Sequence, residues 1–144
     1  MAIGQGDVTV TPVQINMLTG AVGTGRLCRP VISYQLSVIS KQGCEDLNIS
    51  QKTLELLRRG MTAACSPGGT AFPLFGFEPQ VACKTGTAQH GGKETLPHAW
   101  FTVLAPADKP EIALTVLLEA AGEGSYEAAP VAKEILEYWF HERR

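Results

Sequence analysis

The sequence has 144 residues, a length that suits one domain or a large part of one. Hydrophobic residues make up 44% of it and charged residues 18%, which provides enough apolar material for a core and argues against a disordered or coiled-coil protein. The net charge of −2 comes without a basic stripe, and the longest apolar runs are too short to span a bilayer. The composition therefore argues against nucleic-acid binding and against a membrane-spanning segment within the chain.

A first helix is predicted to begin at Pro12, a residue well suited to the first helical position. Thr11 can cap this helix, and Gln14 completes a capping box. The apolar residues that follow have helical spacing, and Gly23 and Gly25 are expected to end the helix.

A second helix is predicted to begin at Ser50, after an extended-looking stretch at residues 27–38 and a polar loop at 43–48. The sequence Ser-Pro-Gly-Gly at 66–69 ends this helix. Its apolar residues recur with helical spacing and are expected to face the core: Leu54, Leu57, Met61 and Ala64.

The second half of the sequence predicts three strands and a helix. The strands are expected at 81–87, 98–105 and 111–118, and their short connections imply antiparallel neighbours. A last helix follows from about residue 126 to 142. This order predicts an α+β fold, an antiparallel sheet flanked by helices. The expected apolar stripe of the last helix is Ala128, Val131, Ala132, Ile135, Leu136 and Trp139.

The four cysteines do not form a Cys-x-x-Cys pair, which excludes a zinc ribbon or a thioredoxin-like motif. Four cysteines allow three pairings, but a chain of this size need not depend on disulfides. We expect free thiols that serve as small apolar residues. The use of cysteine in the sequence does not decide in which cellular compartment the protein lies. The cysteines are Cys28, Cys44, Cys65 and Cys83.

The sharpest chemical feature is the segment Lys84-Thr85-Gly86-Thr87, at the end of the first predicted strand. A lysine and two hydroxyls on one strand edge can bind a carboxylate, because the ammonium attracts it and the hydroxyls donate hydrogen bonds. Gly86 would let a substrate backbone lie close to the edge, and an N–H there can stabilise an oxyanion. Lysine on an edge strand also simply prevents aggregation, and threonine is common in strands. The segment alone is therefore a weak signal.

Further segments accompany it in a fixed order, and together they resemble class B penicillin-binding proteins, especially the penicillin-binding protein 2 subgroup. Lys-Thr-Gly is one of the three motifs that penicillin-binding proteins and β-lactamases share. The resemblance covers nearly the whole chain. The matching segments are Gly4-Gln5-Gly6 with Thr11-Pro12-Val13-Gln14, Met61 with Gly69-Thr70-Ala71, Lys84 to Gln89, His98-Ala99-Trp100-Phe101 with Ala105-Pro106, and Ala128-Ala129-Pro130-Val131-Ala132.

The resemblance implies a peptidoglycan D,D-transpeptidase. In this family a serine attacks the penultimate D-Ala of a stem peptide, and the acyl group passes to an amine on a neighbouring stem; β-lactams acylate the same serine. By resemblance, Lys84 supports the electrostatics and proton transfers of the cleft. Thr85 and Thr87 would bind the carboxylate of the substrate or β-lactam, beside Gly86. The backbone N–H of Thr87 would form half of the oxyanion hole.

One departure from the family pattern limits this interpretation. The sequence contains no Ser-x-x-Lys and no Ser-x-Asn motif, both of which precede the Gly-Gln-Gly segment in the family. We therefore expect residues 1–144 to be the C-terminal portion of a transpeptidase domain, with the last three strands and the terminal helix of the fold. Without the serine this fragment is expected to be inactive, because no acyl-enzyme can form.

The resemblance also implies ligands and partners. The ligands are stem peptides and β-lactams, and other proteins of cell-wall synthesis are possible partners. It implies the extracytoplasmic side of the inner membrane, with an anchor outside this chain, and no cofactor. A D,D-carboxypeptidase stays open as a close alternative, and a non-catalytic binding or sensor module as a more distant one. His90, His98 and Cys83 match no common metal-ligand spacing, so no metal site is expected.

Overall fold

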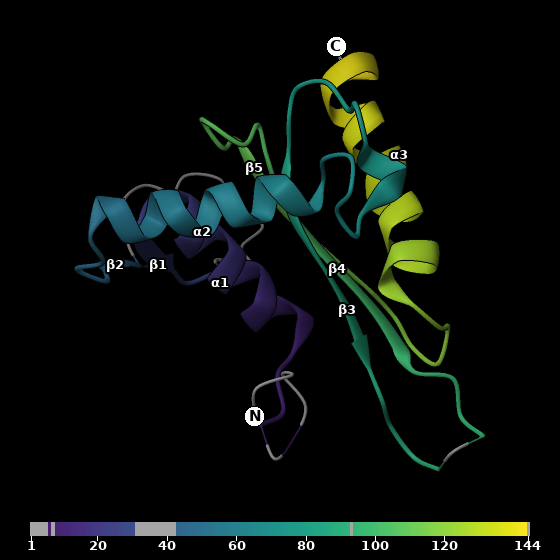
Figure 1. Cartoon of the computed structure of the whole chain (residues 1–144). Coiled ribbons are helices and arrows are strands. Elements are labelled where there is room, and N and C mark those ends of the chain that lie inside the picture. The colour runs from purple at the N-terminus through teal and green to yellow at the C-terminus, as the bar shows by residue number, and fades with distance from the viewer. Residues whose placement is uncertain (1–5, 7, 31–42, 93, 144) are drawn as a thin grey trace.

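The computed structural model describes residues 6, 8–30, 43–92 and 94–143, and it has the predicted α+β architecture (Figure 1). A three-stranded antiparallel sheet lies between α1 and α2 on one face and the C-terminal helix on the other. The elements in chain order are α1 (Pro12–Thr24), β1 (Arg26–Cys28), β2 (Cys44–Asp46), α2 (Gln51–Ala64), a short 3₁₀ helix (Phe72–Leu74), β3 (Ala82–Ala88), β4 (His98–Ala105), β5 (Ile112–Leu118) and α3 (Ala129–Glu137), with π-helical turns before it (Gly124–Ala128) and after it (Tyr138–Glu142).

The three predicted strands are confirmed, with β4 in the centre and β3 and β5 on its two sides. The register pairs Lys84 with Thr102 and Thr102 with Thr115, so these residues form one row across the sheet. Because successive side chains of a strand point to opposite faces, this row lies on the face that α1 covers.

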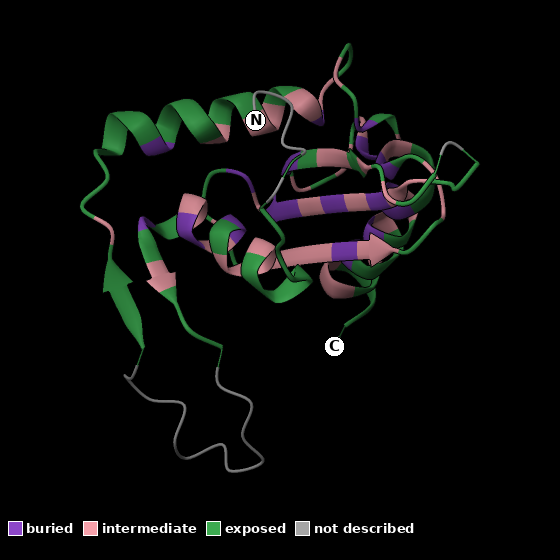
Figure 2. Cartoon of the chain, turned by 90° about the horizontal axis from the view of Figure 1, so that it is seen from below, coloured by how far each residue is buried: buried purple, intermediate pink, exposed green. Residues whose placement is uncertain are grey.

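The main core lies between the sheet and the C-terminal helix, where Phe101 and Val103 of β4 contact a ridge of small and apolar helical residues. Figure 2 shows the buried positions gathered on the sheet and on the elements against it, while α2 is mostly exposed. The predicted stripe of the last helix is only partly confirmed. Val131 and Ile135 are 38% and 40% exposed, because the buried ridge is narrower than the stripe. The buried members of this ridge are Ala128, Ala129, Ala132 and Leu136.

A smaller cluster holds α1 and α2 on the other face, where Val22 and Met61 contact buried Leu104 and Ala82. The prediction that Leu57 faces this core is wrong, since its side chain is 45% exposed. Figure 1 shows that α2 reaches the central sheet only at its C-terminal end, so most of its turns have no sheet beneath them.

Three threonine hydroxyls connect α1 to the middle of the sheet. Thr102 Oγ1 lies 2.7 Å from Thr19 Oγ1 and 2.8 Å from Thr115 Oγ1. Thr19 also donates to the Ile15 carbonyl, and Thr115 donates to Asn16 Oδ1 at 3.2 Å. Thr19 is buried, so its hydroxyl depends on protein partners. This network fixes α1 over the row of residues that ends at Lys84.

Thr102→Val is expected to destabilise the chain by about 1–2 kcal/mol, because it removes the hydroxyl shared by Thr19 and Thr115. Thr62→Val is the matched control, since Thr62 donates only within its own helix, to the Arg58 carbonyl. Urea unfolding curves of the two variants measure the difference. Equal midpoints would show that the network contributes nothing to stability.

The predicted start of α1 is confirmed in detail. The Thr11 hydroxyl accepts from the Gln14 amide, and the Gln14 side chain accepts from the Thr11 amide at 2.8 Å. The predicted end is wrong at Gly23, which lies inside the helix with the Leu104 side chain 3.2 Å from the position of an added Cβ. Gly25 is the residue that ends the helix, in a left-handed conformation with φ of 75°.

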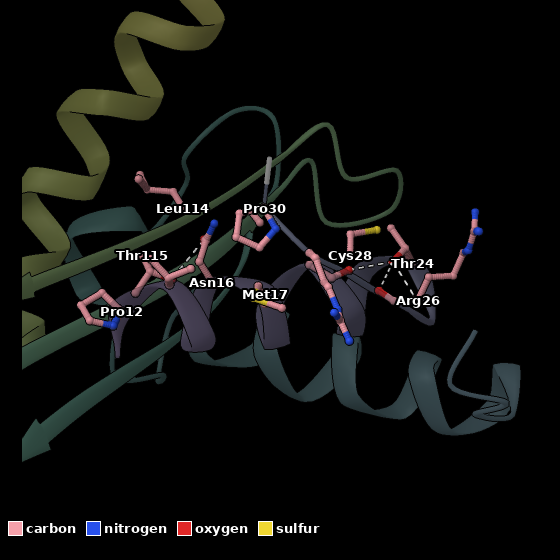
Figure 3. A pocket seen from close by; sticks show the side chains of 13 residues that line it. Pro12, Asn16, Met17, Thr24, Arg26, Cys28, Pro30, Leu114 and Thr115 are labelled. Carbon is pink, nitrogen blue, oxygen red and sulfur yellow. Dashed lines mark hydrogen bonds between the residues drawn. The ribbon is translucent and has the colours of Figure 1, made fainter. Parts of the chain in front are cut away.

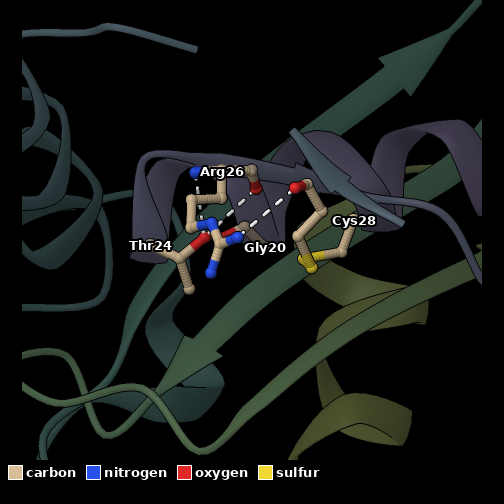
Figure 4. The surroundings of a disulfide bond; sticks show 5 residues. Gly20, Thr24, Arg26 and Cys28 are labelled. Carbon is tan, nitrogen blue, oxygen red and sulfur yellow. Dashed lines mark hydrogen bonds between the residues drawn. A yellow bond between two sulfur atoms is a disulfide. The ribbon is translucent and has the colours of Figure 1, made fainter. Parts of the chain in front are cut away.

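The predicted loop at 43–48 is wrong, because Cys44–Asp46 forms β2 and pairs antiparallel with β1. All three residues of β2 are exposed, so the sequence lacks the apolar alternation that marks a strand. Figure 4 shows how Arg26 supports this pair: its Nη2 donates to the Cys44 carbonyl at 3.3 Å, and its amide donates to the Thr24 hydroxyl. Of the stretch predicted as extended at 27–38, residues 31–38 lie outside the described part of the structure.

The expectation of free thiols is also wrong. Cys28 and Cys44 lie opposite each other in the β1–β2 register and form a disulfide. Cys65, at the end of α2, forms a second disulfide with Cys83 of β3. Both cysteines of the second pair are buried, so they occupy positions of the kind that small apolar residues also fill.

Candidate functional site

The Lys84–Thr87 segment lies on β3, at a free edge of the sheet. In the described part of the chain, β3 is paired with β4 alone. A strand paired on one side directs every second pair of backbone N–H and C=O groups to the open side. The segment therefore has the free backbone groups that an extended ligand could pair with.

The side chains of this segment lie on both faces of the strand. Lys84 belongs to the face covered by α1, whereas Thr85 and Thr87 belong to the opposite face, as strand alternation requires. Lys84 and Thr87 are exposed, and Thr85 is half-buried. The Lys84 ammonium donates to the Thr85 carbonyl, so it lies along the strand. The structure thus brings one cation and two hydroxyls to a single edge, with the cation on the other side of the strand from the hydroxyls.

Gly86 is closely packed within the chain as well as being part of the motif. A Cβ at this position would lie 3.1 Å from the Trp100 Cβ on the neighbouring strand. Gly124, at the start of the C-terminal helix, lies directly against the backbone of Gly86 and Trp100. The missing side chain of Gly124 allows the helix to begin directly against the motif strand, a contact that sequence reasoning did not predict.

Thr70 is a second residue that sequence reasoning did not single out. Its hydroxyl lies 2.9 Å from the hydroxyl of Thr85, although the two residues come from different elements. In the sequence, Thr70 appears only within the Gly-Thr-Ala turn, and nothing in its spacing indicates a contact with the motif.

The three residues considered for a metal site do not come together. Cys83 is bonded to Cys65, while His90 and His98 contact each other with ring centroids 3.8 Å apart. His98 Nδ1 accepts a hydrogen bond from the Ala120 amide at 3.0 Å, which joins the start of β4 to the end of β5. Across residues 6, 8–30, 43–92 and 94–143, no three side chains of the ligating types gather closely enough to hold a metal ion.

A cavity of about 540 Å³ lies between α1, β1 and β5 (Figure 3). Arg26, Asn16 and Thr115 are among its lining residues. This cavity is on the β5 side of the sheet, whereas the motif is on β3, and β4 separates the two. We assign the candidate site to the motif strand, because that strand brings a cation and two hydroxyls to one edge of the sheet.

Comparison with protein families gives an independent result. The family model described as "Penicillin binding protein transpeptidase domain" matches residues 1–137. The chain belongs to the penicillin-binding protein transpeptidase domain family. The resemblance drawn from the sequence is therefore confirmed.

A curated relative and two solved structures show how far this likeness to transpeptidase domains extends. "Peptidoglycan D,D-transpeptidase MrdA" of Haemophilus influenzae is 33% identical, over 99% of this chain and 26% of its own length. A complex between penicillin-binding protein 2 and MreC from Helicobacter pylori is 36% identical, with a TM-score of 0.81 over 96% of this chain and 26% of that one. An imipenem acyl-enzyme complex of penicillin-binding protein A from M. tuberculosis is 30% identical, with a TM-score of 0.73 over 97% of this chain and 33% of that one.

The chain spans about a quarter to a third of the length of these transpeptidase relatives. Within the described ranges, no helix is both long enough and apolar enough to cross a lipid bilayer.

Proposed function

We propose that this chain supplies the C-terminal portion of a serine D,D-transpeptidase domain that cross-links peptidoglycan. The observation that carries the proposal is the Lys84-Thr85-Gly86-Thr87 segment on a free-edge strand, in a chain that belongs to the transpeptidase domain family. The Haemophilus influenzae relative is a peptidoglycan D,D-transpeptidase, which supports the same reaction here. The chain has no Ser-x-x-Lys motif, so the nucleophile must come from sequence that this chain does not contain.

In this proposal the edge of β3 forms one wall of the substrate cleft. Lys84 provides positive charge and takes part in the proton transfers around the serine. The hydroxyls of Thr85 and Thr87 bind the substrate carboxylate, while Gly86 lies between them. The Thr87 N–H donates to the oxyanion, which is a position where a single donor contributes strongly to the rate.

The proposal extends to ligands, partners and location. Stem peptides are the substrates and β-lactams the inhibitors; the imipenem acyl-enzyme structure of the mycobacterial relative supports the β-lactam part of this proposal. Proteins of the cell-wall synthesis machinery are partners, as in the Helicobacter pylori complex with MreC. The domain works on the extracytoplasmic side of the inner membrane. Its two disulfides fit an oxidising compartment of this kind.

Labelling with a fluorescent penicillin tests the proposal. We expect no covalent labelling of this chain and stoichiometric labelling of a form extended upstream through the Ser-x-x-Lys motif. The matched control is the extended form with that serine replaced by alanine, which should stay unlabelled. Absence of labelling in both forms would contradict the assignment as an enzyme and favour a non-catalytic module.

A second measurement separates the transpeptidase from a carboxypeptidase. The extended form is incubated with a stem pentapeptide and an amine acceptor, and mass spectrometry identifies the products. A transpeptidase gives the product joined to the acceptor, whereas a carboxypeptidase gives only the peptide shortened by one D-Ala. If hydrolysis were the only reaction, the proposed activity would be that of a carboxypeptidase and not of a transpeptidase.

A further inference from the structure

The turn after α2 holds Thr70 in a fixed place. The Ala71 amide donates to the Ala64 carbonyl at 2.9 Å, and the Gly69 amide donates to the Ser66 carbonyl at 2.8 Å. Gly69 lies so close to the end of α2 that an added Cβ would be 2.4 Å from the carbonyl oxygens of Ala63 and Ala64. Ala71 is fully buried. The backbone on both sides of Thr70 is therefore bound to the helix end.

The same helix end is connected to the motif strand. The Cys65–Cys83 disulfide joins the end of α2 to β3 two residues before Thr85. Within this frame the Thr70 hydroxyl lies 2.9 Å from the Thr85 hydroxyl, in hydrogen-bonding contact. Thr70 is exposed and Thr85 is half-buried, so the pair lies at the surface beside the free edge of β3. The distance between the two hydroxyls is set by the packing of α2 and β3.

The number of protons decides what this contact can do. Each hydroxyl has one proton to donate and two lone pairs that accept. If Thr85 donated to Thr70, it would have no proton left for a carboxylate. If Thr70 donates to Thr85, the Thr85 proton is free for the carboxylate, and the chain of hydrogen bonds polarises both hydroxyls in the same direction.

We propose that Thr70 is a positioning residue for Thr85 in carboxylate recognition. Its hydroxyl donates to Thr85 Oγ1 and so directs the single proton of Thr85 toward the carboxylate of the substrate or β-lactam. This inference rests on the proposed function, which assigns Thr85 to that carboxylate. Thr70 acts through Thr85 and does not touch the reacting atoms.

The test compares β-lactams with and without the carboxylate in the upstream-extended protein. The second-order rate constant of acylation is measured for a penicillin and for its neutral methyl ester. Thr70→Val is expected to slow acylation by the acid about fivefold, the value of one ordinary hydrogen bond, and to leave the ester unchanged. Thr70→Ser keeps the hydroxyl and should restore the acid rate to within about twofold of the wild type.

The control variant is Thr62→Val, whose hydroxyl bonds only within α2, to the Arg58 carbonyl at 2.9 Å. It should change neither rate constant. A structural role for Thr70 would slow acylation by the acid and by the ester alike, and that result would overturn the inference. So would an unchanged rate with the acid.

A double-mutant cycle with Thr85→Val separates this inference from the proposed function. If Thr85→Val slows the acid alone and Thr70→Val adds no further loss on that background, the two hydroxyls act as one unit. If Thr85→Val slows the acid alone and Thr70→Val has no effect, the inference fails and the proposed role of Thr85 stands. If Thr85→Val leaves the acid rate unchanged, the assignment of Thr85 to the carboxylate fails, and the inference fails with it.

Discussion

Gly124→Ala is expected to destabilise the chain by about 3 kcal/mol or more, at the upper end of overpacking effects. An alanine Cβ at this position would lie 2.1 Å from the Trp100 carbonyl oxygen and 2.5 Å from that of Gly86. Both atoms belong to the backbone of paired strands, so neither can rotate away as a side chain would. The start of the C-terminal helix must then lift off the sheet, or β3 must move at the motif.

Two glycines provide matched controls for this variant. Gly20 in α1 and Gly60 in α2 have no atom within 4 Å of an added Cβ. Alanine at either position should stabilise the chain by about 0.5–1 kcal/mol, because alanine is the better helix former. Urea unfolding measures all three variants, and amide exchange at Gly86 reports any displacement of the strand. A Gly124→Ala variant as stable as the wild type would mean that the helix does not begin on the strand.

The sheet could be predicted from the sequence because its strands satisfy local rules. The segments that became β4 and β5 contain apolar runs bounded by turn residues, and their short connections to each other and to β3 leave antiparallel pairing as the simple choice. The capping box at Thr11 and Gln14 is likewise local, since it depends on residues three apart. Where three to eight neighbouring residues determine an element, the sequence was enough.

The errors concern contacts between residues far apart in the chain. The strand β2 consists of exposed residues, and only its partner β1 makes it a strand. The threonine network joins Thr19 to Thr102, 83 positions apart, and no local pattern indicates that pair. Leu57 follows helical spacing well, but spacing cannot show how much of α2 has a sheet beneath it.

The candidate site likewise has one part that local sequence predicts and another part that depends on contacts between distant residues. The motif itself, Lys84 to Thr87, was found from its sequence, and the structure places it on a free edge. Its supporting residues, Thr70 and Gly124, come from a turn and a helix start, and they reach the motif only through the tertiary fold. A short motif therefore identifies candidate site residues from the sequence, while the residues packed against them require the coordinates.

Removal of the Cys65–Cys83 disulfide, by the double variant Cys65→Ala and Cys83→Ala, is expected to destabilise the chain by about 3 kcal/mol. The bond joins residues 18 positions apart, and the loss of that constraint on the unfolded chain accounts for this value. Since both sulfurs are buried, the cavity left behind adds to the loss. Thermal unfolding of the variant and of the wild type measures the effect.

The other disulfide provides the control for the position of the motif strand. Cys28 and Cys44 are 16 residues apart, so replacing both with alanine should cost a similar entropic amount. Their exposed strand pair is not part of the central sheet, however, so amide exchange in β3 should stay as in the wild type. In the Cys65 and Cys83 variant, the amides from Lys84 to Thr87 should exchange faster, because the motif strand loses its covalent link to α2. Modification of Cys65 and Cys83 by a thiol reagent in the unreduced wild-type protein would show instead that the two cysteines are unbonded. Noncovalent packing alone would then hold the motif strand against the helix.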